Sequence, residues 1–484
     1  MTRKKLGVLS VALITYFNVS GGPWGSEPII AACGPFVGIL AAMIFPFVWC
    51  LPLALSFAEL FSAFPTDSSF CIWVGKAFNR QMGFYVGYWS WVGGVIDNAI
   101  YPCLMVDSIY AVLMGPSAEL QSVIVPWWMY IVRLTAATLF MLPTIHSIDA
   151  VGRFLLVLGA AMIFPFFILV FYAVPQIDPR NWLVVRPEPQ WSQLFSVLYW
   201  SYSGFDAAGA YASEIDQPRR TYPRAMMLTV MLVALTYSIP FFAASGVDKP
   251  HYETWADGYY PIIAEKISGP LLRSWFLVCA ILGNMGVYIA KLTKNGFLLA
   301  GMADLGLAPT YFIERSAATG VPQRAILLSY GIISFMALFD FNVILGVDNF
   351  LSALACVTEL CAVVRLRFKL PDLERPYKVN LSDRGLMAVM VLPLCIGTFV
   401  MLNEFTKSRL SMILNLCAVG AGVIYHRILR RRREKKYLFS PRASKIFTEG
   451  FAFPLDTPVH LTSGTPKQPL LDDSDAATPR TAYT

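Results

Sequence analysis

The chain has 484 residues, of which 56% are hydrophobic and 14% charged, with a formal net charge of +7 and a mean hydropathy of +0.56. Soluble domains carry about 25% charged residues, so this composition excludes an ordinary soluble protein and indicates lipid as the main solvent. The nine cysteines form no C-x-x-C pair and the four histidines are dispersed, so no disulfide framework and no metal site is expected.

Apolar segments follow one another along most of the chain, separated by proline, glycine and charge. A membrane-spanning helix needs about 20 apolar residues. The chain is therefore predicted to be an all-α integral membrane protein with about 12 transmembrane helices. The predicted spans are 6–31, 34–62, 81–113, 122–145, 151–174, 191–214, 224–246, 270–299, 322–341, 345–367, 385–404 and 408–428.

Lysine and arginine are concentrated on one side of these spans. Arg3–Lys5 precede the first span, Arg219–Arg224 follow the sixth, and Lys291 and Lys294 belong to the basic group predicted at the end of the eighth. Under a twelve-span alternation all these groups share one side, so both termini are predicted to be cytoplasmic. Residues 1–430 form the predicted transmembrane domain, and 431–484, rich in Ser, Thr, Pro and charge, form a cytosolic, largely disordered tail.

Two of the predicted spans are interrupted. The first contains Gly21–Pro28, where two glycines and a proline in a row cannot propagate a helix. The sixth contains the weaker interruption Tyr202–Asp206. Apolar sequence resumes after each, which disfavours simple loops at a membrane edge. The first and sixth spans correspond if spans one to five and six to ten form two halves, and matching breaks of that kind indicate a transporter site.

Several motifs resemble those of one transporter superfamily. Gly204–Asp206, Glu214 and Pro218–Ala225 resemble the sixth-helix signature of the amino acid–polyamine–organocation superfamily. Gly301–Pro309, with Gly320–Pro322, is similar to the cytosolic segment that follows its eighth helix. The resemblance implies a LeuT-like core of 5+5 inverted repeats with broken helices 1 and 6, and two peripheral helices.

Two further motifs resemble one branch of that superfamily. Gly21–Glu27 and Gly94–Pro102 are similar to the polyamine-uptake branch found in plants and protozoa, which implies proton-coupled polyamine import. Some superfamily members carry a lysine in the fifth helix as their proton device. Residues 151–174 contain no lysine, so that device does not carry over, and one of the carboxylates is the alternative carrier of the proton.

Three acids lie at predicted membrane depth, where ionised groups are costly and usually functional. Glu27 and Asp206 each follow a break, and Asp97 lies in the third span. Both break acids are expected to leave net negative charge facing the cavity, which favours ammonium groups over a carboxylate. The alternatives are a helix cap for Glu27 and a structural hydrogen bond to Asn98 or nearby backbone for Asp97.

The predicted site combines these acids with break residues and aromatic rings, whose faces attract ammonium groups. Trp200 is the favoured aromatic, whereas Trp73 and Trp127–Trp128 are assigned to an interfacial belt. The predicted substrate-binding residues are Gly21, Gly22, Trp24, Glu27, Asp97, Asn98, Tyr101, Trp200, Ser203, Gly204, Phe205 and Asp206.

Four other groups receive predictions outside the site. Arg133 is expected to pair with an acid. Asp107 and Glu404, near outer span ends, are expected to form a cation vestibule or to be solvated. Glu59 and Glu214 are expected to have gate or structural roles.

The sequence therefore predicts a secondary active importer of polyamines of the putrescine and spermidine class, working by alternating access in the plasma membrane. The proton is the expected coupling ion, and no other cofactor is expected. The alternatives are a cationic or neutral amino-acid transporter or exchanger of the same fold and, remotely, a nutrient sensor. No nucleophile–base, nucleotide-binding or metal motif suggests an enzyme. Nucleic acid is not an expected partner, and neither is a disulfide-linked heavy chain, because 114–121 contains no cysteine.

Overall fold

The computed structural model describes residues 6–66, 68–114, 124–145, 148–248, 252–316 and 319–434. Within these ranges every element is a helix. Two isolated backbone bridges also occur there, between Leu6 and Ile215 and between Ile124 and Phe339. The predicted tail lies outside them except for the last turn of the final helix. Residues 114–121, where the absence of a cysteine was noted, also lie almost entirely outside.

The helices follow the predicted spans closely. Those of the first half are α1 (Val8–Val19), α2 (Pro28–Cys33), α3 (Pro35–Phe45), α4 (Leu51–Ala63), α5 (Ser69–Ala77), α6 (Arg80–Asn98), α7 (Ile100–Met114), α8 (Trp127–Thr144) and α9 (Ile148–Ala173). Those of the second half are α10 (Trp191–Ser201), α11 (Pro218–Val247), α12 (Tyr259–Ser268), α13 (Pro270–Asp304), α14 (Gln323–Met336), α15 (Phe341–Lys369), α16 (Asp383–Thr406) and α17 (Arg409–Glu434). A π-helical turn, Pro46–Cys50, joins α3 to α4, and short 3₁₀ helices span Val174–Gln176, Pro179–Leu183, Phe205–Glu214, Tyr252–Thr254 and Thr310–Phe312.

Seven helical stretches among the described residues are long and apolar enough to cross a membrane. They are Pro35–Ala63, Val157–Gln176, Pro218–Val247, Pro270–Asp304, Phe341–Lys369, Asp383–Thr406 and Arg409–Arg431. The protein is thus an all-helical integral membrane protein. Two helices, α5 and α12, were not predicted because each is short and lies between apolar segments.

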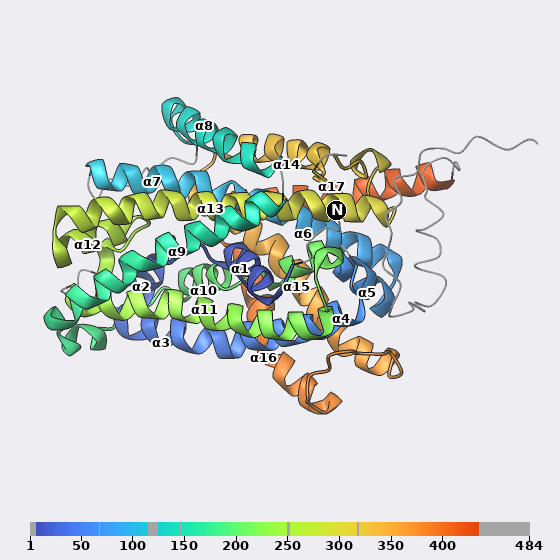
Figure 1. Cartoon of the computed structure of the whole chain (residues 1–484), viewed down its shortest axis with the longest axis horizontal. Coiled ribbons are helices and arrows are strands. Elements are labelled where there is room, and N and C mark those ends of the chain that lie inside the picture. The colour runs from blue at the N-terminus through green and yellow to red at the C-terminus, as the bar shows by residue number, and fades with distance from the viewer. Residues whose placement is uncertain are drawn as a thin grey trace, which may run out of the picture.

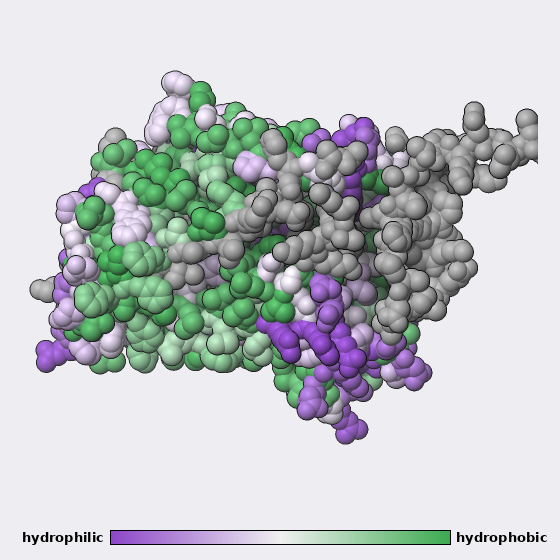
Figure 2. All heavy atoms as spheres, in the orientation of Figure 1, coloured by the Kyte–Doolittle hydropathy of each residue, from purple (hydrophilic) through white to green (hydrophobic). Residues whose placement is uncertain are grey.

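The bundle is built around long helices that lie roughly along one direction (Figure 1). The longest, α13, packs against α6, α7, α9 and α14, and α15 packs between α6 and α16. On the face shown in Figure 2, apolar residues cover most of the body and hydrophilic residues gather toward its ends. Phe171 and Leu271 are among the large apolar side chains left exposed, as expected for a surface that contacts lipid.

The tryptophans divide differently from the prediction. Trp127 and Trp128 are exposed at the start of α8, as expected for an interfacial belt. Trp73 is fully buried, and its ring lies 6.1 Å from that of Phe57. Its assignment to the belt was wrong, because the helix that carries it, α5, packs inside the protein against α6 and α15.

The first predicted break is present. The chain leaves the helix after Val19, passes Gly22 (φ +116°) and Gly25 (φ +80°), and resumes a helix at Pro28. Positive φ is a conformation that glycine adopts without strain. A Cβ atom at Gly21 would lie 2.0 Å from Val287 of α13, so close packing also requires glycine there.

The second break lies against the first. The α10 helix ends at Ser201, and Gly204 (φ +111°) precedes the 3₁₀ helix that starts at Phe205. A Cβ atom at Gly204 would lie 2.6 Å from the carbonyl oxygen of Asn18. The folded chain thus brings the two interruptions, about 180 residues apart in sequence, into contact at one point of the bundle.

Candidate functional site

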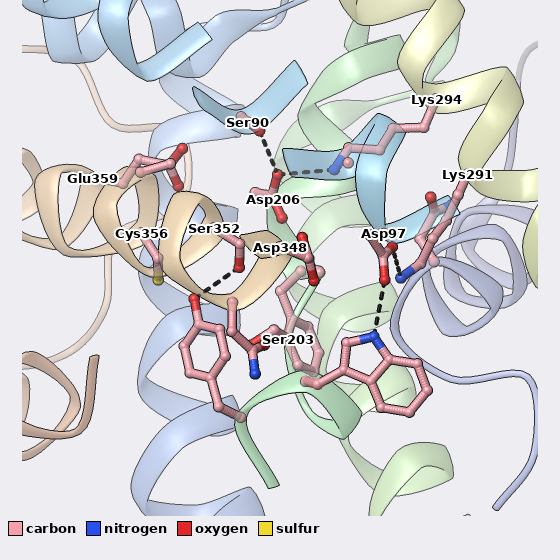
Figure 3. A pocket seen from close by; sticks show the side chains of 18 of the residues that line it. Ser90, Asp97, Ser203, Asp206, Lys291, Lys294, Asp348, Ser352, Cys356 and Glu359 are labelled. Carbon is pink, nitrogen blue, oxygen red and sulfur yellow. Dashed lines mark hydrogen bonds and ion pairs between the residues drawn. The ribbon is translucent and has the colours of Figure 1, made fainter. Parts of the chain in front are cut away.

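A polar cavity lies where the second break meets α6, α13 and α15 (Figure 3). Its empty space, counted together with the part open to solvent, is about 720 Å³. Five of the predicted site residues that line it come from the second break and its flanks, and Asp97 is the sixth. The lining residues that carry polar or charged side chains are Asn18, Ser90, Asp97, Tyr199, Trp200, Ser203, Asp206, Lys291, Lys294, Asn295, Asp348, Asn349, Ser352, Cys356 and Glu359.

Asp97 is held by three donors. Its carboxylate accepts hydrogen bonds from the Trp200 indole N–H at 2.9 Å and the Tyr101 hydroxyl at 3.3 Å, and it forms an ion pair with Lys291 at 2.5 Å. Because α6 ends at Asn98 and α7 starts at Ile100, Asp97 lies at the junction of two helices. The alternative that Asp97 bonds to Asn98 or nearby backbone was wrong. The Asn98 side chain is buried with no hydrogen-bond partner among the described residues and lines neither cavity at the breaks.

Asp206 forms the second ion pair of the cavity. Its carboxylate lies 3.2 Å from the Lys294 ammonium group and accepts a hydrogen bond from the Ser90 hydroxyl at 3.3 Å. The side chain is only half-buried, and Figure 3 shows it among the residues that surround the cavity. Asp206 therefore combines a fixed partner with access to the cavity.

Lys291 and Lys294 were assigned to the wrong place by the sequence. They were counted with the basic residues at the cytoplasmic end of the eighth span, but both are buried inside the bundle on α13. Their spacing of three residues puts them on one face of the helix, and Figure 3 shows both reaching toward the acids. The predicted span 270–299 already contained both lysines. Their position inside an apolar span could therefore have indicated that they lie within the membrane and not at its cytoplasmic edge.

Two further acids, both on α15, were missed. Asp348 and Glu359 line the cavity and are buried, and neither has a hydrogen bond or ion pair with any described residue. Together with Ser352 and Cys356 they follow one side of α15, from 348 to 359, over about 16 Å of helix. Acids inside the apolar span 345–367 were a visible sign of function.

The charges of the cavity do not balance. Four carboxyl groups (Asp97, Asp206, Asp348 and Glu359) face two ammonium groups (Lys291 and Lys294). In their ordinary ionised forms these groups leave an excess of two negative charges. The sequence predicted this sign for the site, but it did not predict the lysines that neutralise half of the acids.

A smaller cavity of about 280 Å³ lies at the first break. It is lined by Gly21, Gly22 and Trp24, and it shares Trp200 with the larger cavity. The rings of Tyr101 and Trp200 stack with centroids 6.3 Å apart. Ten of the twelve predicted site residues, all but Glu27 and Asn98, thus line two neighbouring cavities that share the Trp200 side chain.

Glu27 faces neither cavity. Its carboxylate accepts a hydrogen bond from the backbone N–H of Gly258 at 3.1 Å, and the side chain is buried. Although Glu27 occupies the N-cap position of α2, it makes no side-chain capping bond. The helix-cap alternative was wrong, because the segment before α12 folds over the first break and supplies a donor that no local pattern revealed. The role of Glu27 in substrate binding stays a prediction.

The remaining charged groups have structural partners. Arg133 pairs with Asp107 at 3.2 Å, as predicted for Arg133, and this pair replaces the vestibule or solvated role expected of Asp107. Glu404 is likewise buried, 3.7 Å from Lys407. Glu59 is buried and forms ion pairs with Arg367 and Arg375. The side chain of Glu214 lies outside the described part of the structure.

Comparison with known proteins places the chain in one family. The model of the amino acid permease family matches residues 6–439. A probable polyamine transporter of Arabidopsis thaliana is 32% identical over 423 residues, covering 85% of this chain and 86% of the relative. A polyamine transporter of Oryza sativa subsp. japonica is 30% identical over 438 residues, covering 90% and 80%.

A bacterial relative is more distant. A low-affinity putrescine importer of Escherichia coli (strain K12) is 24% identical over 400 residues, covering 79% of this chain and 84% of the relative. The family and these relatives are transporters, so the protein is a transporter and not an enzyme. With a match along nearly all of its helical part and a polar cavity at two broken helices, this chain belongs to the amino acid permease family of membrane transporters.

Proposed function

We propose that this permease imports polyamines of the putrescine and spermidine class across the plasma membrane, driven by protons. The observation that carries the proposal is the cavity at the second break, where four carboxyl groups face two ammonium groups. Relatives covering most of the chain are named polyamine transporters, which supports the same substrate class.

The cavity favours a flexible polycation over an amino acid for two reasons. Asp348 and Glu359 form no ion pair with any described residue, and an acid without an ion pair at membrane depth is stabilised by an ammonium group. Apolar walls at Leu53, Phe57 and Phe205 provide contact for the methylene chain between ammonium groups. A substrate carboxylate would meet the excess negative charge.

The proposed architecture is a twelve-span, LeuT-like fold with two inverted five-helix repeats. The breaks in the first and sixth predicted spans lie at corresponding positions of the two halves, and they contact each other at Gly204 and Asn18. Alternating access would then rock one group of helices about this contact. Asp348 and Glu359 are the proposed carriers of the coupled proton, because they form no direct ion pair with any described residue.

One observation favours a second candidate, an amino-acid transporter or exchanger of the same fold. Lys291 and Lys294 both reach into the cavity, and an ammonium group is a natural partner for a substrate carboxylate. In this candidate the substrate carboxylate adds a fifth acid to a cavity that already holds four, whereas the ammonium groups of a polyamine reduce the negative excess.

Uptake by reconstituted vesicles distinguishes the two. Labelled putrescine, spermidine, arginine and leucine are supplied separately, with and without an inward proton gradient. We expect uptake of putrescine and spermidine that the gradient accelerates, with little uptake of leucine. Uptake of leucine without either polyamine would contradict the polyamine proposal, and polyamine uptake that ignores the gradient would contradict proton coupling alone.

A further inference from the structure

We propose that Lys291 and Lys294 are resident counter-cations: they occupy the ammonium positions of the empty site, and the substrate displaces them. This inference rests on the proposed polyamine function, because it requires a substrate that carries ammonium groups of its own. It assigns to the two lysines a part in returning the empty carrier, rather than in binding the substrate.

The geometry matches the ends of a polyamine. Each lysine is a primary ammonium group on a four-carbon chain, and both extend from one face of α13 into the same cavity. The Lys294 ammonium group lies 3.2 Å from the Asp206 carboxylate. The Lys291 ammonium group forms an ion pair with Asp97 and lies 5.0 Å from the centre of the Tyr101 ring. A carboxylate beside an aromatic face is the environment expected for a bound ammonium group.

The charge count gives the lysines a role in the transport cycle. A carrier that returns empty must change conformation with its acids still at membrane depth, where unpaired charges are costly. The two lysines reduce the excess from four negative charges to two. A doubly charged polyamine brings the sum to zero, so the loaded cavity is the neutral one.

Two other acids line the same cavity as the displaced lysines. Asp348 interacts electrostatically with both Lys291 and Lys294, and Glu359 interacts with Lys294. The lysine side chain is long and rotatable, so each ammonium group has a second acid available when the substrate takes Asp97 or Asp206. Four acids, two lysines and a dication then form a fully paired cluster.

The test compares net uptake with exchange. Lys294→Met keeps the length of the side chain and removes its charge. We expect the KM for putrescine, a dication, to fall about tenfold, because the substrate no longer competes with a tethered cation. Net uptake into empty vesicles should slow about tenfold, since return of the empty carrier loses its counter-cation. Exchange against internal putrescine should persist near the wild-type rate, because that cycle never returns empty.

Matched variants isolate the effect. Lys291→Met should likewise lower the KM and slow net uptake without slowing exchange. Lys294→Arg keeps the positive charge and should retain net uptake. The double variant Lys294→Met with Glu359→Gln should recover net uptake, because it again leaves an excess of two negative charges. Lys266→Met removes an ion-paired lysine outside the cavity, from Asp248, and should leave the ratio of exchange to net uptake unchanged.

Two results would overturn the inference. One is loss of exchange and net uptake together in Lys294→Met protein that is inserted and thermally stable. The other is a KM that rises, which would mean that the lysine holds the substrate or shapes the site. If Lys294→Met does not fold, Lys291→Met and the double variant decide the question. Failure of the polyamine function is distinct, since wild-type protein would then transport no putrescine in either mode.

Discussion

Asp97 and Asp348 line the same cavity, but of the two only Asp97 forms hydrogen bonds and an ion pair with described residues. Asp97→Asn leaves the buried Lys291 ammonium group without its counter-charge and weakens the bond from Trp200. Loss of one member of a buried pair costs about 3–5 kcal/mol, so we expect a clear drop in the thermal unfolding temperature in detergent.

Asp348→Asn is the matched control, because Asp348 has no ion pair among the described residues to lose. We expect unchanged or higher thermal stability, since the substitution removes like-charge repulsion, together with reduced polyamine uptake. Equal destabilisation by the two substitutions would contradict the division into paired and unpaired acids.

Asp206 is the acid most directly placed to receive substrate, being half-buried at the second break. We expect Asp206→Asn to lower spermidine uptake about tenfold or more, because one charged contact and the Lys294 partner are lost together. Ser90→Ala removes only the hydroxyl donor to the same carboxylate and should cost much less. Labelled uptake, normalised to the amount of inserted protein, measures both; wild-type uptake by Asp206→Asn would remove Asp206 from the site.

Single residues also show where sequence reasoning succeeded and where it did not. Asp97, Trp200 and Asp206 were predicted as site residues, and the fold brings all three to one cavity; their contact with substrate stays a prediction. Lys291 was misplaced and Glu27 faces away, because the partner of each is decided by a segment that is distant in sequence.

At the scale of elements, the second break depends on one glycine. Gly204 has a positive φ, and an added Cβ would lie 2.6 Å from the Asn18 carbonyl oxygen. We expect Gly204→Ala to destabilise the protein by about 1–3 kcal/mol through backbone strain and to lower uptake by separating the two breaks. Thermal unfolding and uptake measure the two effects.

Gly331→Ala supplies the control for that experiment. Gly331 lies inside α14, and an added Cβ would meet nothing within 4 Å. Alanine is favoured over glycine in a helix by about 0.5–1 kcal/mol, so this variant should be as stable as the wild type or more stable. A similar loss of stability and uptake in both variants would mean that the effect of Gly204→Ala does not come from the backbone geometry of the second break.

Ion pairs of Glu59 connect α4 to the end of α15 and to the segment that follows it. The buried Glu59 carboxylate pairs with Arg367 and Arg375 and accepts the Val379 backbone N–H at 2.9 Å. We expect Arg367→Gln to cost about 1.5–3 kcal/mol, the range for a hydrogen bond to a charged group. In a double-mutant cycle with Glu59→Gln, the double variant should lose less stability than the sum of the two single losses. A loss equal to that sum would show that the pair is not coupled.

Helix positions were largely predictable because the apolar pattern of a membrane span is local. The first break was visible in Gly21–Pro28, and the structure places the interruption between Val19 and Pro28. The helices α5 and α12 were not predicted, since each has nine or ten residues and is stabilised by packing against α6 and α13 rather than by its own pattern.

For the whole molecule, the proposed topology places both termini in the cytoplasm. The bridge between Leu6 and Ile215 puts the start of the described chain beside the start of α11, where Arg219–Arg224 lie. We expect an epitope tag at either end of the chain to be labelled by antibody only after the cells are permeabilised. Labelling of intact cells at one end would mean an odd number of spans.

The sequence by itself determined that lipid surrounds this protein, where most helices lie, and where two of the helices are interrupted. Each follows from hydropathy or from the backbone limits of glycine and proline, which act over a few residues. Only the tertiary structure decided which charges meet. Asp97 and Lys291 are 194 residues apart, and such a pair depends on how helices pack. The excess of two acids in the cavity, on which the proposed function rests, is therefore a property of the fold.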